Sequence, residues 1–345
     1  MRRAFVLFGL AALLATVACR KRQAPRPSDA AGTPQTALDP VEAYEGTRSD
    51  GGGAAAAEGF ERAFHRHDEG CKGGDVAACV EMGVDLDEGR GVARDAVAAA
   101  RLYAQGCERN VAAACSDLGQ LYDSGDGVRK DAARASHLYE RGCALGSPLG
   151  CSDLGLDFKD GTGTAQDDTR AVQQFSRGCD LGSADACTNL GFMRSSGRGV
   201  EKDEALATAL YRRACDGGSA QGCHNLAYRY ENGVDLPPSE REALHLYDRA
   251  CTLGLASACD NMGGLFERGK TIAHDMARSA RMFGQACAMG DAMGCNNVGH
   301  MYELGRGVPR DDAKAAAYYR RACDAAVALG CSNLGQLQQA GRAAP

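Results

Sequence analysis

The sequence contains no tryptophan, and aromatic residues make up only 6% of its 345 residues. Its net charge is a modest −6, and lysine and arginine are interspersed with the acidic residues. The chain therefore lacks the basic face that a nucleic-acid-binding protein needs. Beyond the N-terminal segment, no apolar run approaches the roughly 20 residues of a membrane-spanning helix. These absences argue against nucleic-acid binding and against a chain that crosses the membrane within its main part.

Motifs for catalysis are also scarce. A serine β-lactamase carries S-x-x-K at the start of a helix, and no serine here has a lysine three residues later. The histidines are scattered, and only His65 and His67 lie close together, without a third ligand nearby. The spacing of the cysteines is wrong for a structural zinc site. We therefore predict no metal site and no cofactor, and no motif indicates an enzyme.

Cysteine, in contrast, is abundant and regularly spaced. Of the 17 cysteines, Cys19 stands alone, and the others form C-x₇-C pairs that recur every 36 residues without insertion or deletion. A fixed period in this range predicts a solenoid, in which each unit stacks on its neighbours. An even set at constant spacing in an exported protein predicts a disulfide framework. Because every repeat offers the same local partner, we expect the bridges Cys71–Cys79, Cys107–Cys115, Cys143–Cys151, Cys179–Cys187, Cys215–Cys223, Cys251–Cys259, Cys287–Cys295 and Cys323–Cys331.

We number the positions of each repeat from its second cysteine, which is position zero. Apolar or small residues at positions three and four and a large residue at position seven share one face of a helix with that cysteine. Position four is glycine in all repeats but one, which has Ala227. Because glycine costs about 1 kcal/mol against alanine in a helix, its recurrence predicts a close helix–helix approach. The glycine at position ten of every repeat predicts the end of this first helix, with positive φ.

A second helix follows in every repeat. Position 16 carries aspartate or serine, which predicts an N-cap. Tyrosine or phenylalanine stands four residues before the next cysteine, where this helix ends. We therefore expect a repeat array over residues 58–345. It comprises seven full repeats over 79–330 and half-repeat caps at 58–78 and 331–345.

The N-terminus predicts export. Met1-Arg2-Arg3 precedes an apolar run over 4–17 that is typical of a signal peptide. The run ends Thr16-Val17-Ala18-Cys19, which resembles a bacterial lipobox, so we predict a signal peptide over 1–19 and lipidation of Cys19. The alternative is an ordinary cleaved signal. Residues 20–57 are rich in Pro, Ala, Gly and Thr, which predicts a disordered linker.

The full pattern resembles a known family. Between Cys295 and Cys323 the chain follows C-x-N-L-G-x-x-Y-x-x-G-x-G-V-x-x-D-x-x-K/R-A-x-x-Y-x-R-A-C closely, as Sel-one-like repeats do, and most nearly those of the cysteine-rich secreted bacterial proteins of the Hcp type. The resemblance extends over about residues 60–340. It implies an all-α fold, a right-handed αα-superhelix (solenoid) of 36-residue helix-turn-helix repeats related to tetratricopeptide arrays, with one disulfide per repeat. It also implies an alternative function, because some members are described as penicillin-binding proteins or weak β-lactamases.

Candidate binding residues are found where the repeats differ. Positions five and six vary freely, and we expect them to form a stripe along the first helices, which usually line the concave face of such arrays. Position two changes from acidic residues to asparagines along the chain. In related arrays these asparagines clasp an extended peptide, whereas the alternative is that they bond to the neighbouring turn. The candidate ligand-binding residues are Asn189, Phe192, Asn225, Tyr228, Arg229, Asn261, Asn297 and His300.

The leading interpretation is an exported, disulfide-stabilised repeat scaffold for protein–protein or peptide binding in the bacterial cell envelope. The expected location is the periplasmic side, as an outer-membrane lipoprotein that contacts the membrane through its lipid anchor only. The first alternative is a penicillin-binding protein or weak β-lactamase, which would bind a β-lactam. The second is a protein that recognises peptidoglycan stems.

Overall fold

The computed structural model describes residues 53–344. The predicted signal peptide, the lipidation site Cys19 and most of the predicted linker lie outside the described residues. Within 53–344 the chain forms sixteen helices and no strand. The first of these helices begins at Gly53, within the segment 20–57 that was predicted as linker.

Two helices alternate along the array. The first helices of the repeats are α3 (Val76–Glu88), α5 (Ala112–Ser124), α7 (Pro148–Asp160), α9 (Ala184–Ser196), α11 (Ala220–Asn232), α13 (Ala256–Arg268) and α15 (Ala292–Leu304). The second helices are α4 (Ala96–Glu108), α6 (Ala132–Ala144), α8 (Asp168–Asp180), α10 (Glu204–Asp216), α12 (Glu240–Thr252), α14 (Met276–Ala288) and α16 (Asp312–Asp324). The array begins with α2 (Gly53–Lys72) and ends with α17 (Ala328–Gln339).

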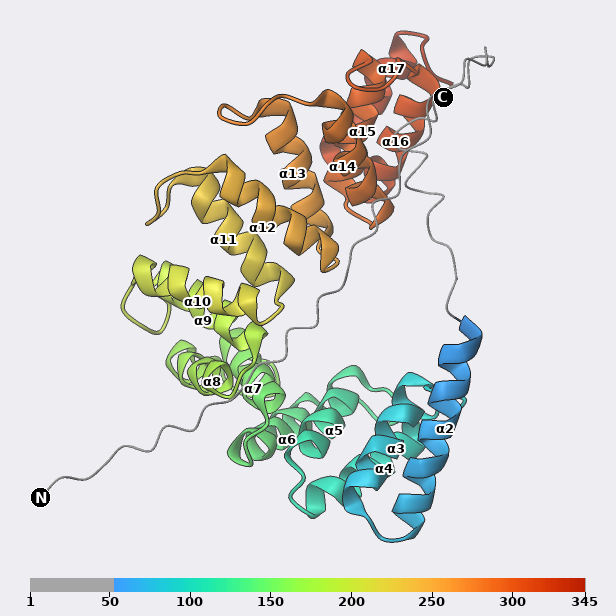
Figure 1. The fold of residues 1–345 in the computed structure, drawn as a ribbon, viewed down its shortest axis with the longest axis vertical. Helices are drawn as coiled ribbons and strands as arrows, with labels where there is room; N and C mark the ends of the chain where they lie inside the picture. Colours follow the sequence, from blue (N-terminus) through green and yellow to red (C-terminus); the bar gives the residue numbers. More distant parts are fainter. Residues whose placement is uncertain (1–52, 345) are drawn as a thin grey trace, which may run out of the picture. The chain divides into compact units, whose positions relative to one another are not determined.

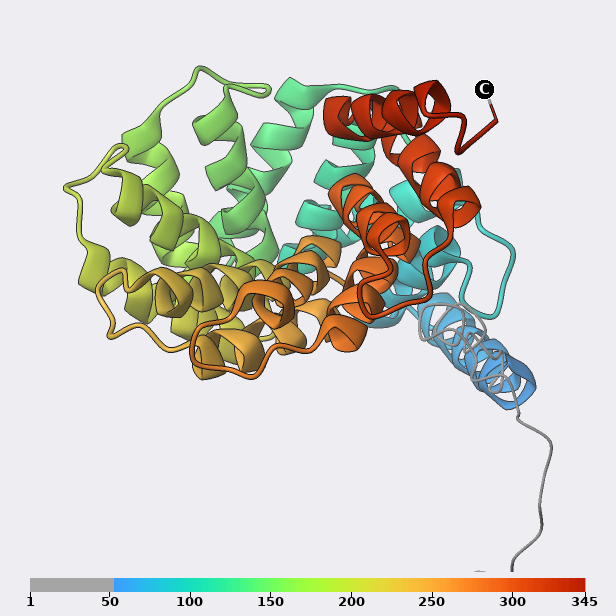
Figure 2. The same ribbon diagram turned by 90° about the horizontal axis from the view of Figure 1, so that it is seen from above.

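Each helix packs on the next one in chain order, and first helices also touch first helices of adjacent repeats, as between α5 and α7 or α9 and α11. Figures 1 and 2 show this succession from two directions. The predicted αα-solenoid of 36-residue repeats is confirmed.

Local signals set the helix ends. At every second helix the predicted N-cap side chain accepts a backbone N–H from the first turn, as Asp131 does from Arg134. Six of the first helices end on the predicted glycine with positive φ. Gly269 is the exception, with φ −48° and ψ 140°. The prediction was wrong there because the backbone amides of Lys270, Thr271 and Ile272 turn toward the carboxylate of Glu240 instead.

The recurrence of glycine at position four predicted a close approach of two helices, and in six repeats this glycine lies against an aromatic ring of another helix. A Cβ on Gly119 would lie 2.6 Å from the ring of Tyr139, and one on Gly155 would lie 2.5 Å from the ring of Phe175. These rings belong to the second helix that follows in the chain. The aromatic side chains therefore fill the interior between paired helices, and only glycine or another small residue leaves room for them.

All eight expected disulfides are present. Each joins the last turn of one helix to the first turn of the next, with Cα–Cα distances from 4.4 to 5.0 Å. Most of the bridged cysteines are buried, including Cys115 and Cys151. The predicted single disulfide per repeat is thus confirmed, and the bridges connect consecutive repeats inside the core.

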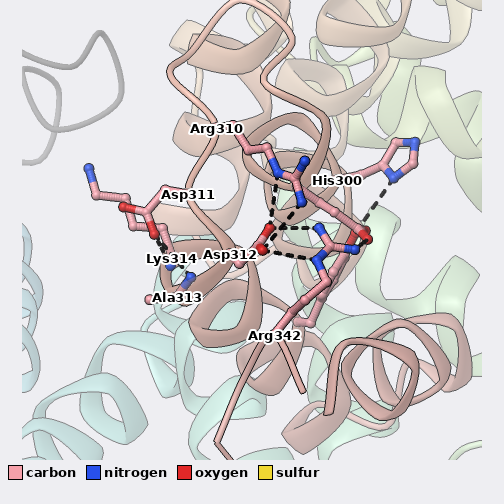
Figure 3. A network of polar contacts seen from close by, with 9 residues as sticks. His300, Arg310, Asp311, Asp312, Ala313, Lys314 and Arg342 are labelled. Carbon is pink, nitrogen blue, oxygen red and sulfur yellow. Dashed lines mark hydrogen bonds and ion pairs between the residues drawn. The ribbon is translucent and has the colours of Figure 1, made fainter. Parts of the chain in front are cut away.

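A further contact joins consecutive repeats at their turns. The first residue of a second helix is an acid in several repeats, and the turn of the next repeat binds it 30 residues later. Arg198 binds Asp168 in this way, and the amide of Lys270 binds Glu240. At the end of the array Arg342 binds Asp312 and Glu303, so the C-terminal segment supplies the contact that a further repeat would make (Figure 3).

Candidate functional site

Position five of the first helices faces solvent in the middle of the array. Phe192 on α9 and Tyr228 on α11 are 47% and 53% exposed, although both are large apolar residues on adjacent repeats. His300, at the same position of α15, is also exposed, and its Nδ1 lies 3.5 Å from the hydroxyl of Tyr319. The predicted exposure of position five is confirmed for these three residues.

Position six is buried in all seven first helices, so the prediction that it shares the exposed stripe was wrong. Arg229 is only 4% exposed. Its guanidinium donates to Glu204 Oε2 at 2.7 Å, to Ser195 Oγ at 2.9 Å and to Thr208 Oγ1 at 2.9 Å. The side chain at position six points toward the second helix of the preceding repeat, and that helix covers it.

The sequence contained a signal for this burial. Residues at position six pair with the residue 21 places earlier, as Arg229 does with Thr208 and Asp157 with Ser136. In other repeats both residues are apolar and belong to one core cluster, as Val172 and Met193 do. The variation that suggested ligand recognition is therefore variation of matched internal pairs.

The asparagines at position two separate into two groups. Asn261 lies 2.9 Å from His224 Nε2, and Asn297 donates to Asp260 Oδ1 at 2.8 Å; each contact reaches the preceding first helix. The partners His224 and Asp260 lie within helices, so these side chains bond to a neighbouring helix and not to the neighbouring turn. Asn189 is half-buried on α9. Asn225 accepts from Gln221 on its own helix at 2.8 Å and lines a cavity.

That cavity lies between α9 and α11 and has a volume of about 190 Å³. It collects Phe192, Asn225, Tyr228 and Arg229, four of the eight candidate residues, but not Asn189, Asn261, Asn297 or His300. The remaining lining residues are Ser195, Tyr211 and Val234. Tyr211, the aromatic residue four positions before Cys215, was not among the candidates from the sequence. Burial raises the pKa of Tyr211, whereas contacts with Arg229 and Asn225 act to lower it.

The cavity combines exposed aromatic walls with a polar base. Arg229 lies over the ring of Tyr211, with its guanidinium carbon 5.1 Å from the ring centroid. The ion pair with Glu204 balances the charge of Arg229, and hydrogen bonds from Lys202, Arg229 and Ser195 lower the pKa of Glu204 to about 2. The base of the cavity is thus electrically balanced and fixed in position, whereas Phe192 and Tyr228 remain accessible. Such a site suits an apolar side chain next to hydrogen-bonding backbone.

A second cavity, of about 220 Å³, lies between α5 and α7. Its lining includes three carboxylates, Asp123, Asp153 and Asp157, together with Tyr139 of α6. Burial raises the pKa of Asp153 and of Asp157 to about 6. No candidate residue from the sequence lies here, although Asp153 belongs to the polar ladder at position two. Only the adjacency of the two helices brings these carboxylates together.

Neither a metal site nor a membrane span is found among the described residues. No group of three His, Cys, Asp or Glu side chains within 53–344 is placed to hold a metal ion. No helix in that range is both long and apolar enough to cross a bilayer. The penicillin-binding alternative gains no support from the two cavities or from the relatives described below.

The fold and its bridges define a disulfide-linked αα-repeat protein with an aromatic cavity on its first helices. Seven consecutive segments match the Sel1 repeat: 76–111, 112–147, 148–183, 184–219, 220–255, 256–291 and 292–327. The chain belongs to the Sel1 repeat family. Proteins built from these repeats generally bind other proteins.

Solved structures of the same fold exist. The protective antigen c5321 of uropathogenic Escherichia coli, which has an SLR fold, is 26% identical with a TM-score of 0.66, over 82% of this chain but only 60% of that protein. A Sel1 repeat protein from Oxalobacter formigenes is 21% identical with a TM-score of 0.63, over 71% of this chain and 96% of that one. Cysteine rich protein B of Helicobacter pylori is 27% identical over 39% of this chain and 98% of that one, with a TM-score of 0.32. No curated protein matches the sequence.

Proposed function

We propose that the protein is a scaffold that binds a segment of another protein through the cavity between α9 and α11. The observation that carries this proposal is the pair Phe192 and Tyr228. These two large side chains, at the same position of adjacent repeats, stay about half exposed beside a cavity. Residues of this size are buried in most folds, and aromatic residues are enriched among those that dominate binding energy.

The base of the cavity supports the same proposal. An extended segment brings backbone N–H and C=O groups to any site that takes one of its side chains, and these groups need partners. The side-chain amide of Asn225 and the hydroxyl of Tyr211 line the cavity next to the aromatic walls, where such groups would arrive. Arg229 is held beside them by Glu204, Ser195 and Thr208 and lies over the ring of Tyr211.

A selection of peptides tests this function. A random peptide library displayed on phage is selected on the oxidised protein and on the double variant Phe192→Ser/Tyr228→Ser. Wild type is expected to enrich a set of related peptides that the double variant fails to bind. The matched control is Leu181→Ser/Leu253→Ser, which removes two exposed apolar side chains elsewhere on the array. Equal binding of the selected peptides by the Phe192/Tyr228 variant would refute the site.

We also propose that the protein works outside the cytoplasm, on a lipid anchor. The sequence around Cys19 supports this, and so does the presence of eight disulfides, because such bonds persist in oxidising compartments. Growth with an alkyne fatty acid, followed by coupling to a fluorophore, is expected to label wild type and not Cys19→Ala. A secreted, unlabelled wild-type protein would show instead that the signal is cleaved without lipidation.

A further inference from the structure

The two cavities occupy the same place in different repeats. Each is lined at positions two, five and six of one first helix, at positions five and eight of the preceding first helix, and by the aromatic residue of the second helix between them. The equivalent residues lie 72 positions apart, which is twice the 36-residue period: Gln120 and Phe192, Asp123 and Ser195, Tyr139 and Tyr211, Asp153 and Asn225, Leu156 and Tyr228, Asp157 and Arg229.

Because the two cavities share one framework, the difference between their lining residues indicates a difference in the ligand groups that they bind. In both cavities the ring of a buried tyrosine lies at the base and the first helices form the sides, so the two have similar size. In the cavity between α5 and α7 three of the six equivalent positions are acidic. In the cavity between α9 and α11 the same positions hold Ser195, Asn225 and Arg229, and the exposed walls are aromatic. The row of first helices thus carries two subsites, one acidic and one aromatic.

The acidic subsite carries an uncompensated negative charge. Asp153 accepts from Gln120 at 3.3 Å and Asp157 accepts from Ser136, and both of these partners are neutral. The neighbouring charges that raise the pKa of the two carboxylates are other carboxylates, Asp123 among them, and none of the ion pairs found within residues 53–344 includes Asp153 or Asp157. Buried carboxylates without a cation are costly, and an incoming cation offsets that cost. The aromatic subsite has no such charge, because Glu204 balances Arg229.

We propose that one extended polypeptide segment lies along the first helices α5 to α11, with a lysine or arginine side chain in the Asp123–Asp153–Asp157 cavity and an apolar side chain in the Phe192–Tyr228 cavity. This inference rests on the proposed binding function and adds the chemistry of the ligand. Opposite charge selects the residue at one subsite, and apolar contact selects the residue at the other. Because the repeats are regular, the two ligand residues are separated by a constant number of positions.

The test compares the peptides selected by three forms of the protein. Wild type is expected to enrich peptides in which a lysine or arginine stands at a fixed distance from an apolar residue. Asp123→Asn/Asp153→Asn keeps the shape of the acidic cavity but removes its charge, so it is expected to keep the apolar preference and lose the basic one. Asp248→Asn/Asp324→Asn changes the net charge equally at exposed positions outside the cavity and is expected to select as wild type does.

A selected synthetic peptide then gives the size of the effect. Replacing its basic residue by glutamine is expected to weaken binding to wild type by about tenfold or more, and to change binding to Asp123→Asn/Asp153→Asn little. Peptides that depend on Phe192 and Tyr228 but show no basic preference would overturn this inference and leave the proposed function intact. Failure of wild type to select any peptide would overturn both. Unchanged far-UV circular dichroism of each variant shows that the array is folded.

Discussion

Arg342 donates to both oxygens of the Asp312 carboxylate, from Nε at 2.9 Å and from Nη2 at 2.6 Å. The same relationship holds 144 residues earlier, where Arg198 donates to both oxygens of Asp168. A position that elsewhere joins one repeat to the next thus closes the last repeat onto the C-terminal segment (Figure 3). Because bidentate arginine–carboxylate contacts fix geometry as well as charge, this pair holds the C-terminal cap.

We expect Arg342→Gln to loosen the end of the array and leave its middle unchanged. Hydrogen exchange measured by mass spectrometry should show faster exchange of the amides of α17, with unchanged exchange in α9. Terminal repeats open most readily, so the effect should stay local. Arg198→Gln is the matched variant and should speed exchange near α8 and α9 instead. Identical exchange of α17 in wild type and Arg342→Gln would show that the contact does not hold the cap.

Glycine at position four should have opposite effects in the middle and at the end of the array. A Cβ on Gly119 meets the ring of Tyr139 at 2.6 Å, whereas a Cβ on Gly335 meets nothing within 4 Å. Gly119→Ala is expected to lower the free energy of unfolding by about 1–3 kcal/mol through overpacking. Gly335→Ala is expected to raise it by up to about 1 kcal/mol, because alanine favours the helix. Urea denaturation of both variants measures the difference, and two changes of the same sign would contradict it.

Reduction of the disulfides should strongly destabilise the array. Each bridge closes a short loop, and a loop of this length stabilises the folded state by about 2.5 kcal/mol in the chain-entropy model. The sum over eight bridges is therefore large compared with a typical net stability of about 5–15 kcal/mol. We expect the melting temperature to fall by tens of degrees in excess dithiothreitol. An unchanged melting temperature, with reduction verified by mass spectrometry, would show that helix packing alone is sufficient.

Stability should rise when the pH falls from 7 to 5. Burial raises the pKa of Asp117, Asp153, Asp157 and Asp260 to about 6, above the value of roughly 3.9 in an unfolded chain. The folded state therefore binds protons that the unfolded state does not bind in this interval, and protonation favours folding. Thermal melts at several pH values should show an increase of a few degrees. Asp153→Asn should reduce that increase, and a melting temperature that only falls on acidification would contradict the prediction.

Below about pH 4 the trend should reverse. The carboxylate of Glu240 accepts from three backbone amides and from the Thr271 hydroxyl, and these bonds lower its pKa to about 2. A depressed pKa stabilises the folded state above the unfolded value of roughly 4.3, and this contribution disappears as the pH falls through 4 toward 2. Glu240→Gln should melt earlier than wild type at pH 6, with a smaller difference at pH 3. A constant difference at both pH values would show that the charge of Glu240 plays no part.

Much of the fold followed from residues close together in the chain. The N-cap at Asp131, the glycine at the end of α5 and the bridge Cys107–Cys115 each depend on a few neighbouring residues, and their spacing repeats without change. The glycine at position four also revealed a contact with a partner helix, because nothing in a single helix favours glycine there. Gly269 was mispredicted because its turn is set by Glu240, a residue of the preceding repeat unit.

The candidate site was predicted only in part, because it depends on how repeats face one another. Periodicity placed Phe192 and Tyr228 outside and the scaffold inside, since a helix has one buried face whatever it packs against. Periodicity could not predict the burial of positions at the edge of that face, because a neighbouring helix determines whether they are covered. Arg229 was therefore predicted to be exposed. Each cavity joins residues of three helices, and these residues are spread over more than 30 positions of the chain. The sequence by itself determined the repeat, its helices and its bridges, which are local. The stacking of helices alone decided which variable residues pair inside and which stay exposed beside the cavities.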